Sequence, residues 1–135
     1  MHLRVKVSEC AFCNLCSLAC AFKHSGTLSL ARAAIRVSPE LPDRLKVKVN
    51  FCIQCSQGYC IESCPQKALR REEDGRVTVE ELLCDACQGE YRCVPACKVN
   101  GIFRSPDGAR PVKCDLCGGD PECAKVCPNE LISVA

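Results

Sequence analysis

Cysteine is the residue type with the clearest chemical potential in this sequence. The chain has 135 residues and 16 cysteines. They fall into four groups of four with nearly the same internal spacing. The groups are Cys10-x2-Cys13-x2-Cys16-x3-Cys20, Cys52-x2-Cys55-x4-Cys60-x3-Cys64, Cys84-x2-Cys87-x5-Cys93-x3-Cys97 and Cys114-x2-Cys117-x5-Cys123-x3-Cys127. Because a [4Fe–4S] cluster takes four sulfur ligands, the count predicts four [4Fe–4S] clusters with every cysteine a metal ligand.

The spacing within each group suits a loop that wraps a cubane. Three closely spaced cysteines reach three irons, so the fourth ligand must come from elsewhere. In two-cluster ferredoxins, the fourth cysteine of each run binds the other cluster. The longer gaps of the later groups contain glycine, as at Gly58, Gly89 and Gly118. Glycine allows positive φ and a close approach of backbone amides to sulfur.

Two other uses of cysteine have to be weighed. Structural zinc also uses Cys-x2-Cys pairs, but it usually joins two such pairs a dozen or more residues apart. Here a Cys-x3-Cys follows each pair within a few residues, although a zinc-binding interaction module stays an alternative. A disulfide framework requires a secreted chain. The start, residues 1–7, alternates apolar and basic residues and has no apolar core of a signal peptide. We therefore expect a reducing, cytoplasmic location.

Composition excludes several classes of partner. The formal charge is +2, but four oxidised clusters with their thiolates would bring it to about −6. No basic cluster interleaved with aromatic residues is present, so we expect no nucleic-acid partner. No apolar run approaches the ~20 residues of a membrane span, so we expect no direct membrane insertion. With no Trp and one Met, the ordinary core is small, and bound clusters would supply folding free energy.

The segments between the cysteine groups predict an α+β fold of short hairpins and short helices. Three hairpins are expected around the turn signals at residues 39–43, 73–75 and 106–108. The first and last segments, Leu3–Val7 and Leu131–Val134, also alternate like strands, and their pairing would bring the first group beside the last. Short helices are expected after the third cysteine of each group.

No catalytic apparatus is visible. The sequence has no convincing nucleophile–base pair, phosphate loop or paired carboxylates, so we predict no catalytic residues. His2 and His24 are expected to be surface residues. The position of His24, four residues after Cys20, would allow it to touch a cluster or a partner.

The four runs resemble the four-cluster ferredoxin-type subunits of complex iron–sulfur oxidoreductases. Examples are the electron-transfer subunits of dimethyl sulfoxide reductase and formate dehydrogenase, the carbon monoxide dehydrogenase-associated ferredoxin, and the small subunits of tungsten aldehyde oxidoreductases. The resemblance spans Cys10 to Pro128. It implies a tandem, duplicated bacterial-type ferredoxin fold in a single unit, 1–135, with an outer half from 1–30 plus 100–135 and an inner half from 45–100. The short chain favours a soluble partner, and among these examples we favour the small subunit of a tungsten aldehyde oxidoreductase.

The resemblance also implies which cysteines share a cluster. In this family, run one pairs with run four and run two with run three, each exchanging its fourth cysteine. Carried over, the ligand sets are Cys10, Cys13, Cys16 and Cys127; Cys114, Cys117, Cys123 and Cys20; Cys52, Cys55, Cys60 and Cys97; and Cys84, Cys87, Cys93 and Cys64.

The predicted function is transfer of single electrons without catalysis. Four clusters in a chain this small must be close neighbours and can form a wire. The expected partners are a catalytic tungsten or molybdenum subunit, of the aldehyde oxidoreductase type, and a second redox partner such as a flavoprotein or ferredoxin. A free-standing polyferredoxin carrier and the zinc-binding interaction module are the alternatives.

Overall fold

The computed structural model describes residues 1–40 and 42–135 and shows an α+β protein. All its strands are short and antiparallel, and each pairs with one other strand. The strands are β1 (Leu3–Val5), β2 (Arg36–Glu40), β3 (Asp43–Asn50), β4 (Leu69–Arg71), β5 (Val77–Val79), β6 (Ile102–Phe103), β7 (Val112–Lys113) and β8 (Ile132–Val134).

Helices and 3-10 turns fill the segments that carry the cysteines. The α-helices are α1 (Leu15–Ser25), α2 (Tyr59–Ser63), α3 (Cys93–Ala96) and α4 (Glu122–Val126). The 3-10 turns are η1 (Val7–Glu9), η2 (Leu30–Arg32), η3 (Ala86–Gly89) and η4 (Leu116–Gly119).

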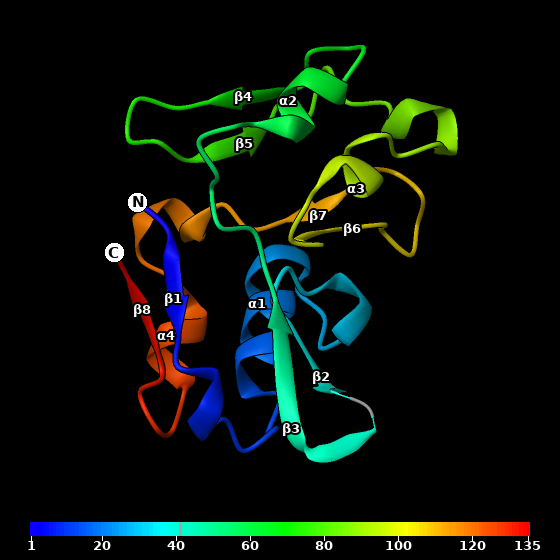
Figure 1. Ribbon diagram of the computed structural model, residues 1–135. Coiled ribbons are helices and arrows are strands. Elements are labelled where there is room, and N and C mark those ends of the chain that lie inside the picture. The colour runs from blue at the N-terminus through cyan, green and yellow to red at the C-terminus, as the bar shows by residue number, and fades with distance from the viewer. Residues whose placement is uncertain (41) are drawn as a thin grey trace.

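The two ends of the chain form one small sheet. β1 and β8 pair antiparallel, with Leu3 opposite Val134 and Val5 opposite Ile132. Figure 1 shows the N- and C-termini next to each other at this sheet. This confirms the predicted pairing of the first and last segments, and it brings the first cysteine group beside the fourth.

The three predicted hairpins are also confirmed. β2 pairs with β3, β4 with β5, and β6 with β7, all antiparallel. Gly75 with φ 91° and Gly108 with φ 71° lie in the second and third turns, as the sequence indicated. The first turn is shorter than expected, because Pro39, Glu40 and Asp43 belong to β2 and β3. Leu41, one residue of the expected turn at 39–43, lies outside the described residues.

The helices differ from the expectation in their position. The three short helices contain the third cysteine of their groups and end before the fourth. Cys64, Cys97 and Cys127 are all extended. A following proline favours this conformation at Cys64 and Cys127, whereas Cys97 adopts it before Lys98. α1 is longer than expected. It begins before Cys16, continues past Cys20, and ends at Gly26, whose φ of 72° makes a left-handed cap.

Side chains are buried in two separate cores. The larger core contains Leu3, Ile35 and Leu116 together with Cys20 and Cys123. The smaller core has five buried members, which are Cys60, Leu69, Val77, Cys93 and Ile102. Helix α1 packs on α4 and α2 packs on α3. In Figure 1, α2 and α3 lie in the upper half of the view and α1 and α4 in the lower half, with the β6–β7 hairpin next to α3.

Across residues 1–40 and 42–135, no helix combines the length and the apolar character that crossing a membrane requires.

Candidate metal centres

Three cavities are each lined by four cysteines. In every case three cysteines come from one group and the fourth is the last cysteine of another group. We name the sets quartet A (Cys10, Cys13, Cys16 and Cys127), quartet C (Cys52, Cys55, Cys60 and Cys97) and quartet D (Cys64, Cys84, Cys87 and Cys93).

The remaining four cysteines, quartet B, also lie close together. They are Cys20, Cys114, Cys117 and Cys123. Three of them, Cys20, Cys114 and Cys123, belong to the larger core. Burial, with a smaller contribution from the nearby charges of Cys114, Cys20 and Cys117, raises the pKa of Cys123 to about 12. Each quartet therefore combines three cysteines of one run with one from a distant run.

The quartets follow one another in a single order. Burial is the main cause of the raised pKa values of Cys123, Cys114 and Cys93. A smaller contribution comes in each case from a cysteine of another quartet. The charge of Cys16 (quartet A) raises the pKa of Cys123 (quartet B), and that of Cys52 (quartet C) raises the pKa of Cys114 (quartet B). The charge of Cys60 (quartet C) raises the pKa of Cys93 (quartet D). These neighbours connect the quartets in the order A, B, C, D.

Backbone amides point at the cysteine sulfurs. After three of the fourth cysteines, the amide of the residue four positions on donates to the sulfur. The bonds are Ala68 N to Cys64 Sγ at 3.3 Å, Gly101 N to Cys97 Sγ at 3.2 Å and Leu131 N to Cys127 Sγ at 3.4 Å. For Cys20 the donor is instead Ala34 N, at 3.3 Å. The segment between α1 and β2 thus brings the backbone back to Cys20 and supplies the equivalent N–H···S bond. Such N–H···S bonds stabilise thiolates and adjust cluster potentials.

The Cys-x2-Cys loops share an unusual backbone conformation. In all four, the residue directly before the second cysteine has positive φ, and none of these residues is glycine. They are Phe12 (60°), Gln54 (54°), Ala86 (55°) and Leu116 (60°). The left-handed region costs a non-glycine residue about 1–2 kcal/mol, so the loops are held in this shape by their surroundings. Nothing in the sequence indicated it, because the expected glycines, such as Gly118 (φ 74°), lie further along.

The sulfur spacing decides which metal group the quartets fit. All 16 cysteines lie among the described residues and all are free, so they form no disulfide framework. Among the described residues, only His24, Asp115 and Cys117 form a group of three or more potential ligands whose donor atoms all lie within 4.8 Å of one another. A tetrahedral zinc with Zn–S bonds of about 2.3 Å needs sulfurs about 3.8 Å apart. Within the part of the chain that the structure describes, no quartet meets the 4.8 Å limit, so the four sulfurs of a quartet are too far apart for a single tetrahedral zinc ion.

Burial keeps the metal-free thiols protonated. It raises the pKa of Cys93, Cys114 and Cys123 from 9.0 to about 12. A metal that binds these sulfurs must displace their protons, and its positive charge makes that displacement favourable.

Gln54 connects two quartets, and its role was not predicted from the sequence. Its side chain is buried. The Nε2 atom donates to the carbonyl of Cys114 at 2.8 Å, and Oε1 accepts from the backbone N–H of Val77 at 2.7 Å and from Lys113 Nζ at 3.3 Å. The loop of quartet C is thereby fixed to Cys114 of quartet B. The sequence did contain one indication of this role: Gln54 is polar, whereas the residues directly before the second cysteine of the other three groups are apolar.

Two relatives resemble the chain over most of its length. The polyferredoxin-like subunit of an aliphatic sulfonate oxidoreductase from Pyrococcus furiosus is 36% identical over 121 residues, which cover 88% of this chain and 66% of the relative. A polysulfide reductase subunit of Wolinella succinogenes is 31% identical over 137 residues, covering 92% of this chain and 70% of the relative. The protein thus spans about two thirds of the length of these relatives. No family model matches it.

The fold also resembles a solved structure. A subunit of the active site complex BamBC of benzoyl-coenzyme A reductase, with benzoyl-CoA bound, superimposes with a TM-score of 0.56 at 26% identity. The match covers 98% of this protein and 77% of that subunit. With the arrangement of the cysteines and the similarity of the relatives, this shows that the protein belongs to the family of ferredoxin-like electron-transfer subunits of oxidoreductase complexes.

Proposed function

We propose that the chain is a non-catalytic electron-transfer subunit that holds four [4Fe–4S] clusters, one in each of quartets A to D. The carrying observation is that separate cavities lie against quartets A, C and D, each lined by four cysteines from two runs. When bound, each cluster would supply one-electron redox chemistry. The protein provides the ligands, the N–H···S bonds and the fixed order of the sites.

The proposed unit is one interlocked body of two ferredoxin-like halves, residues 1–30 plus 100–135 and residues 45–100. Packing of α1 on α4 and of α2 on α3 supports the duplication. Two of the buried core residues cross between the halves. Cys52 packs in the core of the first and last segments, and Ile102 packs in the core of the middle segments. The halves therefore cannot separate without disrupting quartet C.

Quartets A and D are the proposed terminals of the wire, because they stand at the two ends of the order. Cys13 of quartet A is exposed, and the adjacent Phe12 is 39% exposed. Beside Cys84 of quartet D, Leu82 is 94% exposed and Leu83 is 52% exposed. Apolar side chains next to a terminal site are suited to docking against a redox partner.

The proposed partners are a catalytic subunit with tungsten or molybdenum, of the aldehyde oxidoreductase type, and a second redox protein such as a flavoprotein or ferredoxin. This assignment is supported by the family resemblance. The names of the two relatives favour a second candidate for the catalytic partner, an oxidoreductase that acts on sulfonates or polysulfide. A free-standing polyferredoxin is the competing function, whereas the sulfur spacing argues against a zinc module.

Anaerobic purification of the tagged chain from its native cells tests the proposal. We expect a larger subunit to co-purify in equal amounts and to contain tungsten or molybdenum by elemental analysis. The Leu82→Asp variant should lose a partner that binds beside quartet D, while Leu28→Asp, at a residue that is 65% exposed, serves as the control. A brown protein that purifies alone under all conditions would instead support the free-standing carrier.

A further inference from the structure

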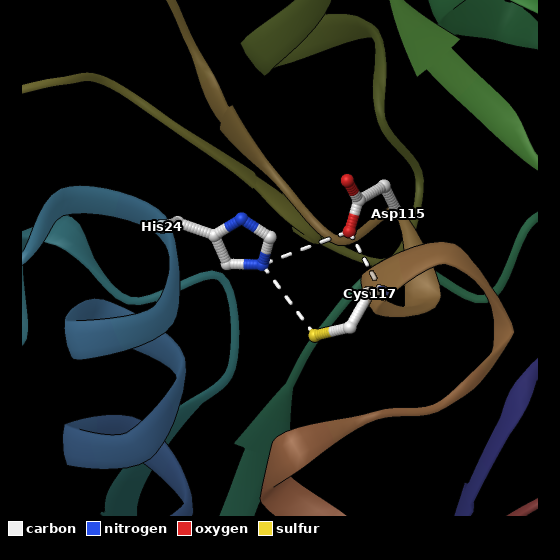
Figure 2. A group of neighbouring side chains, drawn as sticks. All are labelled: His24, Asp115 and Cys117. Carbon is white, nitrogen blue, oxygen red and sulfur yellow. Dashed lines mark hydrogen bonds and ion pairs between the residues drawn. The ribbon is translucent and has the colours of Figure 1, made fainter.

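His24 approaches one cysteine of quartet B. Its Nε2 atom lies 3.6 Å from Sγ of Cys117 and 3.6 Å from Oδ1 of Asp115. Figure 2 shows the imidazole of α1 directed at these two groups across the gap between the helix and η4. The same Oδ1 atom of Asp115 accepts the backbone N–H of Cys117 at 2.8 Å. The three side chains form a connected cluster around one sulfur.

The position of His24 follows from the helix that carries it. His24 is in the last turn of α1, four residues after Cys20. Residues four apart lie on the same face of a helix, and Cys20 is itself a member of quartet B. The ring also forms part of the wall of a cleft of about 260 Å³. α1 therefore directs both a ligand and a ring nitrogen toward the same centre, with the ring on the solvent side.

The hydrogen on the ring can be assigned from the neighbours. A cluster-bound cysteine is a thiolate and accepts hydrogen bonds, and an ionised aspartate also only accepts. A lone pair on Nε2 would face two negative groups, so Nε2 carries the hydrogen. We infer that His24 is a positioning residue that donates Nε2–H to the Cys117 sulfur and thereby raises the reduction potential of the cluster in quartet B. This inference rests on the proposed function.

The direction of the effect follows from charge. A donor at a ligand sulfur withdraws electron density and stabilises the more negative, reduced cluster. A hydrogen bond that is about 1.4 kcal/mol stronger to the reduced than to the oxidised cluster corresponds to a tenfold change in the reduction equilibrium, or about 59 mV for one electron.

The third run provides an internal comparison. Asp85 accepts the backbone N–H of Cys87 at 2.8 Å, as Asp115 does from Cys117. The side chain beside Asp85 is Gln66, whose Nε2 donates to the carboxylate at 3.5 Å. Quartet D thus has the same aspartate turn as quartet B. The side-chain amide of Gln66 contacts the aspartate there, whereas in quartet B the imidazole of His24 contacts the cysteine sulfur.

A separate metal ion at His24, Asp115 and Cys117 is the rival interpretation. Their donor atoms are close enough to hold one. However, Cys117 is one of 16 cysteines that divide into four quartets. Giving it to another ion would leave quartet B with three sulfur ligands, so the hydrogen bond accounts for all the cysteines and the ion does not.

Pulsed EPR on reduced holoprotein with ¹⁵N-labelled histidine tests the inference directly. The chain has only two histidines, so the label marks His2 and His24 alone. We expect a ¹⁵N coupling to a reduced cluster that persists in His2→Gln and disappears in His24→Phe. An EPR-monitored redox titration should show one midpoint potential shifted down in His24→Phe, by about tenfold in the equilibrium constant. The wild-type midpoint potential should be restored in His24→Gln, because the glutamine amide can donate a hydrogen bond to the Cys117 sulfur in place of the imidazole. Gln66→Leu should leave this potential unchanged.

The outcomes separate this inference from the proposed function. A protein with all its iron but no ¹⁵N coupling, or with the same potentials in His24→Phe, overturns the role of His24 and leaves the four clusters standing. A colourless protein overturns both. If His24→Phe loses iron, the ¹⁵N coupling still decides the question, because it should be present in the wild type and absent from His24→Gln that retains its iron. A stoichiometric zinc ion that leaves with His24→Gln would overturn the hydrogen bond in favour of a separate ion.

Discussion

Cys10 and Cys127 lie at the wall of the same cavity, although they come from the first and the last cysteine groups of the chain. The β1–β8 sheet brings these groups together, and the fourth cysteine of the last group completes the set begun by the first. The cysteines that are neighbours in the sequence are therefore not the ones that surround one cavity. Each proposed cluster would crosslink two distant segments, as a disulfide would, but with four attachments.

The exchange of fourth cysteines can be tested with single substitutions. Cys20→Ala and Cys117→Ala should damage the same cluster, that of quartet B, and give matching EPR spectra. Each should also lose up to about four irons per chain. Cys16→Ala should damage quartet A and give a different spectrum, which Cys127→Ala should match. If Cys20→Ala instead matches Cys16→Ala, the crossed assignment is wrong.

Gln54 should be essential for holding quartets B and C together. Replacement by leucine leaves the N–H of Val77 without its partner, at a cost of about 1–3 kcal/mol for a buried group. It also removes one of two donors to the carbonyl of Cys114, which keeps Lys113 Nζ at 3.0 Å. We expect a lower thermal unfolding temperature of the holoprotein and altered coupling between clusters by EPR. Gln57→Leu, at an exposed residue of the same loop, is the matched control. Equal stability of the two variants would contradict the role of Gln54.

Gly101 is a position where the backbone leaves no room for a side chain. A Cβ there would lie 2.5 Å from the carbonyl oxygen of Phe51 and 2.7 Å from the backbone nitrogen of Cys52. The Gly101 N–H also donates to Cys97 Sγ. Gly101→Ala should therefore displace the loop of quartet C, cost about 1–3 kcal/mol in unfolding free energy, and lower iron content.

Gly108→Ala provides the comparison for Gly101→Ala. Its Cβ would meet nothing within 4 Å, but φ is 71°, so only the strain of the left-handed backbone is expected, about 1–2 kcal/mol. Iron content should stay at the wild-type level. Loss of iron in Gly108→Ala but not in Gly101→Ala would refute the importance of the close approach at Gly101.

Retention of iron should increase with pH. In the metal-free chain the pKa of Cys93, Cys114 and Cys123 is raised to about 12, so these thiols bind protons throughout the neutral range. Each proton competes with iron for the sulfur, and the competition weakens as the pH rises. Incubation with a chelator calibrated at each pH should remove less iron at pH about 8.5 than at about 6.5. Equal or greater loss at the higher pH would be inconsistent with the raised pKa values.

Local sequence signals predicted the hairpins, because turn residues such as Gly75 and Gly108 lie between alternating segments. The β1–β8 pairing was predicted as well, from two strand-like ends. Helix lengths were less predictable. Nothing before Gly26 stops α1, so it continues past Cys20, whereas Pro65 and Pro128 follow cysteines that end their helices.

The contacts that organise the sites span long sequence separations, and this is why they could not be predicted. Gln54 bonds to Cys114 across 60 residues, and His24 meets Cys117 across 93 residues. The spacing between Cys20 and His24 indicated that His24 could lie near a cluster. It did not indicate that Cys117 is the partner sulfur, because that contact depends on how α1 packs on the last segments. The left-handed conformation of Phe12 and Leu116 is imposed by the wrapped loop and is not a preference of these residues.

Sixteen cysteines that hold four [4Fe–4S] clusters are the central proposal, and the most direct test is to count iron and acid-labile sulfide in anaerobically purified protein while recording its absorbance. We expect about 16 irons and 16 sulfides per chain, with a brown colour and broad absorbance near ~400 nm that bleaches on addition of dithionite. A colourless protein that contains zinc, with no labile sulfide, would contradict the proposal.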